Sequence, residues 1–89
     1  MKAVITVIGK DMVGILAKVS ANCADKNINV LEVTQSILQD LFVMVMLVDI
    51  SGSSIPFSDF AETLDTMGQE IGVKIHTMHE DIFQAMHRI

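Results

Sequence analysis

Apolar residues recur along the chain at two spacings, which predict strands in some stretches and helices in others. Residues 2–8 are rich in Val and Ile and predict a β-strand. Residues 13–26 place their apolar side chains on one face at helical spacing, with polar residues on the other face. The apolar positions of this first helix are Ile15, Leu16, Val19 and Cys23. Asn27 follows as a residue that tolerates a left-handed cap.

A β-hairpin is predicted in the middle of the chain. Residues 29–39 and 41–50 both have strand character, and Gln39-Asp40 between them is suited to a tight turn. Strict alternation along residues 29–39 assigns one face of that strand to five positions. They are Asn29, Leu31, Val33, Gln35 and Ile37. The 41–50 strand is different, because it is apolar on both of its faces.

The clearest helix covers residues 57–71, after Pro56, which suits a first helical turn. Gly72 is expected to end it, and Gly68 lies on its apolar face, where a missing side chain permits close packing. Residues 73–78 predict a fourth strand. A short amphipathic helix is predicted over residues 79–89, with Ile82, Phe83, Met86 and Ile89 on one face.

This order of elements predicts one α+β domain spanning residues 1–89. It is the ferredoxin-like βαββαβ sandwich, in which right-handed crossovers place two helices on one face of a four-stranded antiparallel sheet, plus a short C-terminal helix. A strand with one wet face should alternate apolar and polar residues, but the 41–50 strand does not. We therefore expect the second face of the sheet to be covered, partly by the terminal helix and partly by a second copy in a homodimer.

Composition and charge exclude several classes of partner. The chain has 89 residues, is 51% hydrophobic and carries a net charge of −5 with a pI of about 4.8. An acidic chain is a poor partner for nucleic acid or for an anionic membrane. No apolar run is long enough to span a bilayer, and a single cysteine cannot form an internal disulfide. We expect a cytoplasmic protein.

The loop between the first strand and the first helix is the main candidate for ligand binding. It is bracketed by Gly9 and Gly14, which allow sharp bends and close approach of a ligand to the backbone. Asp11 is placed to cap the helix, and the remaining free amides at the helix start form a natural site for a carboxylate or phosphate. The alternative is purely structural, with Asp11 as a cap and Gly14 as a close-packing residue.

Two short motifs resemble those of the ACT domain family. They are Asp11-Met12-Val13-Gly14-Ile15-Leu16-Ala17 at the first strand–helix junction and Asn27-Ile28-Asn29-Val30 at the start of the second strand. Together with the order of elements, this resemblance covers about the whole chain. The chain is also similar to the ACT halves of glycine-cleavage regulators. Val13 stands where the family usually carries a proline.

The resemblance implies a stand-alone regulatory module that dimerises, binds an amino acid or related small molecule at the dimer interface, and acts through a regulated protein partner. The residues it implicates are Asp11, Met12, Val13, Gly14 and Ile15 on the loop, and Ile28, Asn29, Val30 and Leu31 across the interface. Helix amides would hold the α-carboxylate, and Asp11 or Asn29 would accept from the α-ammonium. Ile15 and the strand residues would set the size of the ligand side chain. The alternative for Asn29 is that it is simply a solvated residue at the start of a strand and contacts no ligand.

Other functions fit the residues less well. An acylphosphatase needs an arginine in the first loop, whereas the sole arginine is Arg88. RNA recognition on this fold needs exposed aromatics and a basic surface, and metal delivery needs a Cys-x-x-Cys motif that is absent. His76 and His79 would point to opposite faces of a strand, which disfavours a shared metal. We expect no enzyme activity and no cofactor. The main alternative is a structural assembly domain with no small ligand.

Overall fold

A computed structural model describes residues 1–10 and 14–86. The elements in chain order are β1 (Lys2–Gly9), α1 (Ile15–Asp25), β2 (Asn29–Leu38), β3 (Leu41–Asp49), α2 (Phe57–Ile71), β4 (Lys74–His79) and α3 (Glu80–Met86). This is the predicted βαββαβ order with a short helix at the end. The predicted ferredoxin-like fold is therefore confirmed.

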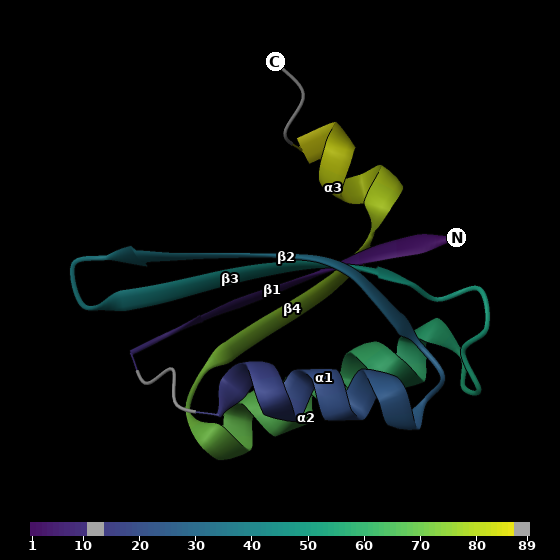
Figure 1. Cartoon of the computed structure of the whole chain (residues 1–89), viewed down its shortest axis with the longest axis horizontal. Coiled ribbons are helices and arrows are strands. Elements are labelled where there is room, and N and C mark those ends of the chain that lie inside the picture. The colour runs from purple at the N-terminus through teal and green to yellow at the C-terminus, as the bar shows by residue number, and fades with distance from the viewer. Residues whose placement is uncertain (11–13, 87–89) are drawn as a thin grey trace.

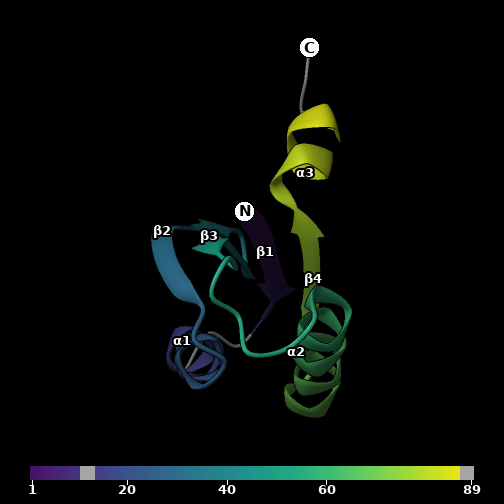
Figure 2. The ribbon, with the colours of Figure 1, turned by 90° about the vertical axis from the view of Figure 1, so that its right-hand side faces the viewer.

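One four-stranded antiparallel sheet organises the molecule. Its strand order is β2-β3-β1-β4, so β1 and β3 are the central strands, and β2 and β4 are the edges. Helices α1 and α2 lie on one face of the sheet, and α3 lies on the opposite side (Figures 1 and 2). The two main helices cover the same face because both crossovers are right-handed.

The core lies between the sheet and helices α1 and α2. Alternate residues of the two central strands point into it, because successive side chains of a strand face opposite sides. The fully buried members of the core with the largest side chains are Phe60, Ile5, Met44, Met46, Leu64, Val7, Val19, Val48 and Cys23. Cys23 is therefore a small apolar core residue, as its position on α1 predicted.

The turns follow the predicted chemistry. Leu38 pairs with Leu41 across the β2–β3 hairpin, so the loop is the two-residue turn Gln39-Asp40, with Gln39 at φ +58°. Asn27 has φ +60° after α1, and Gly72 has φ +82° after α2. Asparagine and glycine reach this left-handed region at the lowest cost, which explains their positions at the two helix exits.

Gly68 lets α2 pack directly on β4. A Cβ atom added at Gly68 would lie 2.8 Å from the carbonyl oxygen of Val73 and 3.0 Å from a side-chain carbon of Ile75. A side chain at this position would collide with backbone, which cannot move aside cheaply. The predicted close-packing role of Gly68 is thus confirmed.

The predicted faces of β2 are wrong at its start. A bulge at Leu31 shifts the pairing with β3, so that Val30 opposes Val48 while Glu32 opposes Leu47. The extra residue reverses the alternation. Val30 therefore shares the helix-covered face with Val33, Gln35 and Ile37, and Asn29 does not. A one-residue insertion of this kind changes the face of every preceding side chain.

Candidate functional site

The first part of the candidate site is the N-terminal end of α1. Gly14 is the capping residue and adopts φ +77°, ψ −2°, and its carbonyl accepts the first helical hydrogen bond, from the Lys18 amide at 2.9 Å. The amides of residues 15–17 precede this bond and so have no acceptor within the helix. Apart from Gly14 and its two neighbours in the chain, no described residue has a heavy atom within 4 Å of the position a Gly14 Cβ would occupy. Free amides and the positive end of the helix dipole favour a ligand carrying negative charge at such a helix start.

The Ile15 side chain does not face a ligand site in the single chain, contrary to the expectation that it sets the size of the ligand side chain. Its side chain is only 3% exposed and packs in the core. In a single chain, the part of Ile15 available to a ligand is its backbone amide. The predicted residues Asp11, Met12 and Val13, including the proposed Asp11 cap, lie outside the described residues.

The second part of the candidate site lies where the chain leaves α1 and enters β2. The Ile28 side chain is buried, and its amide donates to the Cys23 carbonyl at 2.8 Å, which closes the end of the helix. Asn29 is exposed at the start of β2, Val30 is half-buried, and the bulged Leu31 is 44% exposed. A shallow hollow of about 320 Å³ lies beside them, lined by Ala24, Asn27, Ile28 and Asn29.

The strand end of the site carries a carboxylate. Asp49 of β3 pairs with Asn29 in the sheet register, so the two side chains project to the same side. The backbone amide of Ser51 donates to Asp49 at 2.9 Å, and this bond together with the Ser51 side chain lowers the pKa of the Asp49 carboxyl group. Asp49 is therefore ionised at neutral pH. The Met1 ammonium donates to the Ser51 hydroxyl at 2.7 Å and lies 3.8 Å from the same Asp49 oxygen, within ion-pair distance.

The two parts of the site lie at opposite ends of α1. The helix has 11 residues, and at about 1.5 Å per residue it separates Gly14 from Asn29 by about 16 Å or more. Consecutive α-carbons in a chain are only about 3.8 Å apart, so a single amino acid cannot bridge this distance. Within one chain, the predicted loop and strand residues do not form one site.

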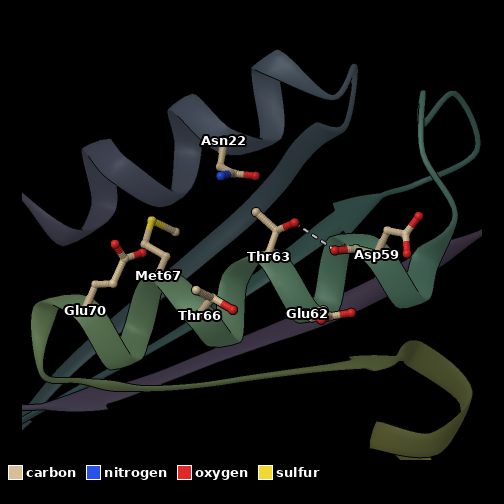
Figure 3. Close-up of a pocket in the computed structure, with 7 residues that line it drawn as sticks. All are labelled: Asn22, Asp59, Glu62, Thr63, Thr66, Met67 and Glu70. Carbon is tan, nitrogen blue, oxygen red and sulfur yellow. Dashed lines mark hydrogen bonds between the residues drawn. The ribbon is translucent and has the colours of Figure 1, made fainter.

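A separate groove lies between α1 and α2 (Figure 3). It has a volume of about 570 Å³ and is lined by Asn22, Asp59, Glu62, Thr63, Thr66, Met67 and Glu70. Thr63 is engaged within its helix, because its hydroxyl donates to the Asp59 carbonyl at 2.8 Å. The buried Oδ1 atom of Asn22 has no hydrogen-bond partner among the described residues.

Sequence reasoning missed this groove. Asp59, Glu62 and Glu70 recur at helical spacing along α2, and this spacing is equally typical of a solvated helix face. The groove exists because the two helices sit apart on the sheet, as Figure 2 shows. Its three carboxylates would repel the carboxylate of an amino acid, so the groove does not fit the predicted ligand.

The cysteine and the two described histidines of the strands do not form a reactive site. Burial raises the pKa of the Cys23 thiol to about 11, so Cys23 is not a nucleophile at neutral pH. His79 stacks on Phe57 of α2, with ring centroids 4.0 Å apart, while His76 faces the other side of the sheet, as its register with Thr6 shows. Among residues 1–10 and 14–86, no three His, Cys, Asp or Glu side chains are grouped to hold a metal ion.

None of the helices described is long and apolar enough to cross a bilayer.

Comparison with known proteins decides the family. The family model described as ACT domain matches residues 2–78. The chain belongs to the ACT domain family. A UPF0237 protein of Methanocaldococcus jannaschii is 44% identical over 88 residues, which cover 99% of this chain and 98% of that protein. The resemblance seen in the sequence is thereby confirmed.

Two solved structures agree with the fold. An ACT domain protein from Streptococcus pneumoniae is 37% identical, covers 98% of both chains and superimposes with a TM-score of 0.81. The regulatory subunit of aspartate kinase from Thermus thermophilus is 27% identical over 85% of this chain and 49% of that subunit, with a TM-score of 0.62. ACT domains are generally regulatory modules that bind small molecules.

Proposed function

We propose that this ACT domain senses an amino acid or a closely related metabolite at a site shared between two copies of the chain. The observation that carries the proposal is the position of the two half-sites. We call the N-terminal end of α1 with Gly14 the loop half, and the start of β2 with Asn29 the strand half. Because they lie at opposite ends of one helix, a complete site requires two chains.

A symmetric pair with antiparallel α1 helices would complete the site. In such a pair, the loop half of one copy meets the strand half of the other, and the two-fold axis repeats this arrangement. Each pair therefore has two identical sites. Asp11, Met12 and Val13 belong to the loop half in this proposal, as the family resemblance implies.

The chemistry of the two halves is complementary to an α-amino acid. The loop half offers free amides and the positive end of the α1 dipole, which favour the α-carboxylate. The strand half offers the Asn29 side-chain oxygen and the ionised Asp49, which favour the α-ammonium. Leu31, exposed at the bulge, is the residue that would contact the ligand side chain.

The module is proposed to regulate a partner protein and not to catalyse a reaction. In the described part of the chain, the single thiol is buried and protonated, and the two histidines lie on opposite faces of the sheet. Neither is paired with a group that would activate it as a nucleophile or base. Binding of a ligand between two copies would instead change their separation or stability, which a partner protein can read.

A thermal-shift screen against the twenty amino acids and common phosphorylated metabolites tests the proposal. A ligand that binds only the folded state adds roughly 2.7 kcal/mol of stability at a hundredfold excess over its Kd. For a domain of this size, that corresponds to a rise in melting temperature of roughly 10–20 °C. No rise with any compound would contradict the sensor function.

Two matched glycine variants locate the loop half. Gly14 and Gly72 both have positive φ, and at neither would a new Cβ meet a neighbour within 4 Å among the described residues. Asparagine tolerates this conformation, so Gly14→Asn and Gly72→Asn should cost similar stability, about 1 kcal/mol. We expect Gly14→Asn to abolish the ligand-induced shift and Gly72→Asn to keep it. An equal response of both variants would place the site elsewhere.

The exposed apolar residues of the sheet favour a second function, that of a structural assembly domain. The sheet face opposite α1 and α2 carries exposed apolar residues, which fits a structural assembly domain without a small ligand. Such a domain would associate through this face and show no ligand-induced shift in the screen. The same thermal measurement therefore separates the two functions.

A further inference from the structure

The groove between α1 and α2 is lined by three carboxylates that no described cation neutralises. Asp59, Glu62 and Glu70 lie along one stripe of α2 and are exposed (Figure 3). The ion pairs found within residues 1–10 and 14–86 involve none of them. Helix α2 has four acidic residues and no Lys, Arg or His, so it contributes −4 to the net charge of −5. This side of the molecule therefore attracts cations.

Glu70 lies where its charge opposes the stability of its own helix. It belongs to the last turn of α2, where the helix dipole favours cations, and that turn contains no basic residue. Residues that break a local stability rule in this way are expected at functional sites. The position of Glu70 therefore favours a role in binding over a role in the fold.

A polar group from α1 points into the same groove. The Asn22 side chain extends from α1 towards Thr63 of α2 (Figure 3). Its Oδ1 atom is buried and has no hydrogen-bond partner among the described residues, a state that costs free energy. Rotation of the amide about its last side-chain bond would turn this oxygen to a donor lying in the groove. A ligand with both positive charge and hydrogen-bond donors would satisfy the groove.

We infer that the groove binds a basic, extended segment of the partner protein that this module regulates. As a partner site it rests on the proposed function, although the binding itself requires no amino acid ligand. An arginine guanidinium carries positive charge and several N–H donors, so it can donate to a carboxylate of α2 and to the Asn22 oxygen. The apolar stem of the arginine can lie on Met67, which lines the groove and is half-buried.

The spacing of the carboxylates indicates an elongated occupant. Glu62 and Glu70 are about 12 Å apart along the axis of α2. Carboxylates this far apart are poorly placed to share one metal ion, whose ligands lie within about 2.5 Å of it. An extended chain rises about 3.1–3.3 Å per residue, so two basic residues about four positions apart match the distance.

NMR titration of the whole chain with a proline-stiffened peptide tests the inference. The probe is Arg-Pro-Thr-Pro-Arg, which holds its two arginines about 12 Å apart, and the control peptide has glutamate at both ends. We expect the arginine peptide alone to shift the amide signals of Asn22, Thr63 and Thr66. Glu62→Gln and Glu70→Gln should each weaken its binding by up to about fivefold, as expected for exposed ion pairs.

Asp65→Asn is the matched control variant. It removes the same charge from the same helix, but Asp65 lies outside the groove lining and accepts from Gln69 at 3.0 Å. Its dissociation constant for the peptide should equal that of the wild type. Asn22→Ala removes the unpaired oxygen, so it should weaken binding without lowering the melting temperature. The melting temperature of every variant shows that it is folded.

The outcomes separate a groove from a general attraction of charge. Signal shifts confined to the groove, with binding weakened by Glu62→Gln and Glu70→Gln but not by Asp65→Asn, support the inference. No binding of the peptide, or an equal loss in all three charge variants, overturns it. Spermidine that binds as tightly as the peptide also overturns it, because a small polyamine would then suffice.

The thermal-shift screen keeps this inference distinct from the sensor function. An amino acid that raises the melting temperature, together with no peptide binding, would contradict only the groove inference. Peptide binding in the groove, together with no amino acid response, would support the groove and contradict only the sensor function.

Discussion

Replacing Phe60 with alanine is expected to lower the free energy of unfolding by about 3–5 kcal/mol. Phe60 is 1% exposed and lies on the core face of α2, against the central strands. Truncation would remove a large apolar side chain from a packed layer and leave a cavity that the surrounding strands cannot fill. Urea denaturation, followed by circular dichroism, measures the loss directly.

Phe57→Ala is the matched control for Phe60→Ala. Phe57 lies one turn earlier on α2, is only partly buried and stacks on His79 at 4.0 Å. Its truncation should cost less, about 1–2 kcal/mol, because part of the ring already faces water. A Phe60→Ala variant no less stable than Phe57→Ala would show that the core is not centred between α2 and the sheet.

Gly68→Ala is expected to destabilise the protein although alanine is the better helix former. The new Cβ would lie 2.8 Å from the Val73 carbonyl oxygen, and forcing α2 away from β4 should cost about 1–3 kcal/mol. The gain in helix propensity, about 1 kcal/mol, offsets only part of this cost. Differential scanning calorimetry should show a lower melting temperature.

A substitution to alanine at an exposed position of α2 should change the stability in the opposite direction. Thr66 is exposed, so Thr66→Ala gains helix propensity without a collision and should stabilise by a few tenths of a kcal/mol. If Gly68→Ala were as stabilising as Thr66→Ala, α2 and β4 would not be in the close contact described.

The sequence predicted the elements because their patterns are strong and local. The 57–71 helix repeats its apolar residues at each turn, and Gln39-Asp40 between two apolar runs indicates a hairpin without reference to the rest of the chain. The uncovered apolar face was also predictable, since β3 is apolar on both sides. Burial in the fold follows this pattern, with Phe42 and Met44 buried and Val43 half-buried.

Other features depend on contacts that no local pattern records. The bulge at Leu31 inserts one residue into the register with β3, and an apolar residue there is compatible with either alternation. The groove between α1 and α2 depends on how far apart the helices sit on the sheet. The buried Ile15 side chain was assigned to ligand selection by the family resemblance, although its place on the apolar face of the first helix already indicated burial.

The separation of the two half-sites follows from the length of α1, and it is the central claim of the proposed function. Mixing two defective variants tests it most directly. Gly14→Asn spoils the loop half and Asn29→Ala spoils the strand half, so each variant alone should fail to bind the amino acid that gives the largest thermal shift. In a mixed pair, the intact loop half of one chain meets the intact strand half of the other.

After the two variants are unfolded together and refolded, isothermal titration calorimetry counts the restored sites. Random pairing makes half of the pairs mixed, each with one intact site, so about one quarter of the wild-type number of sites should return with wild-type affinity. Binding by either variant alone, or no binding by the refolded mixture, would contradict a site shared between two chains.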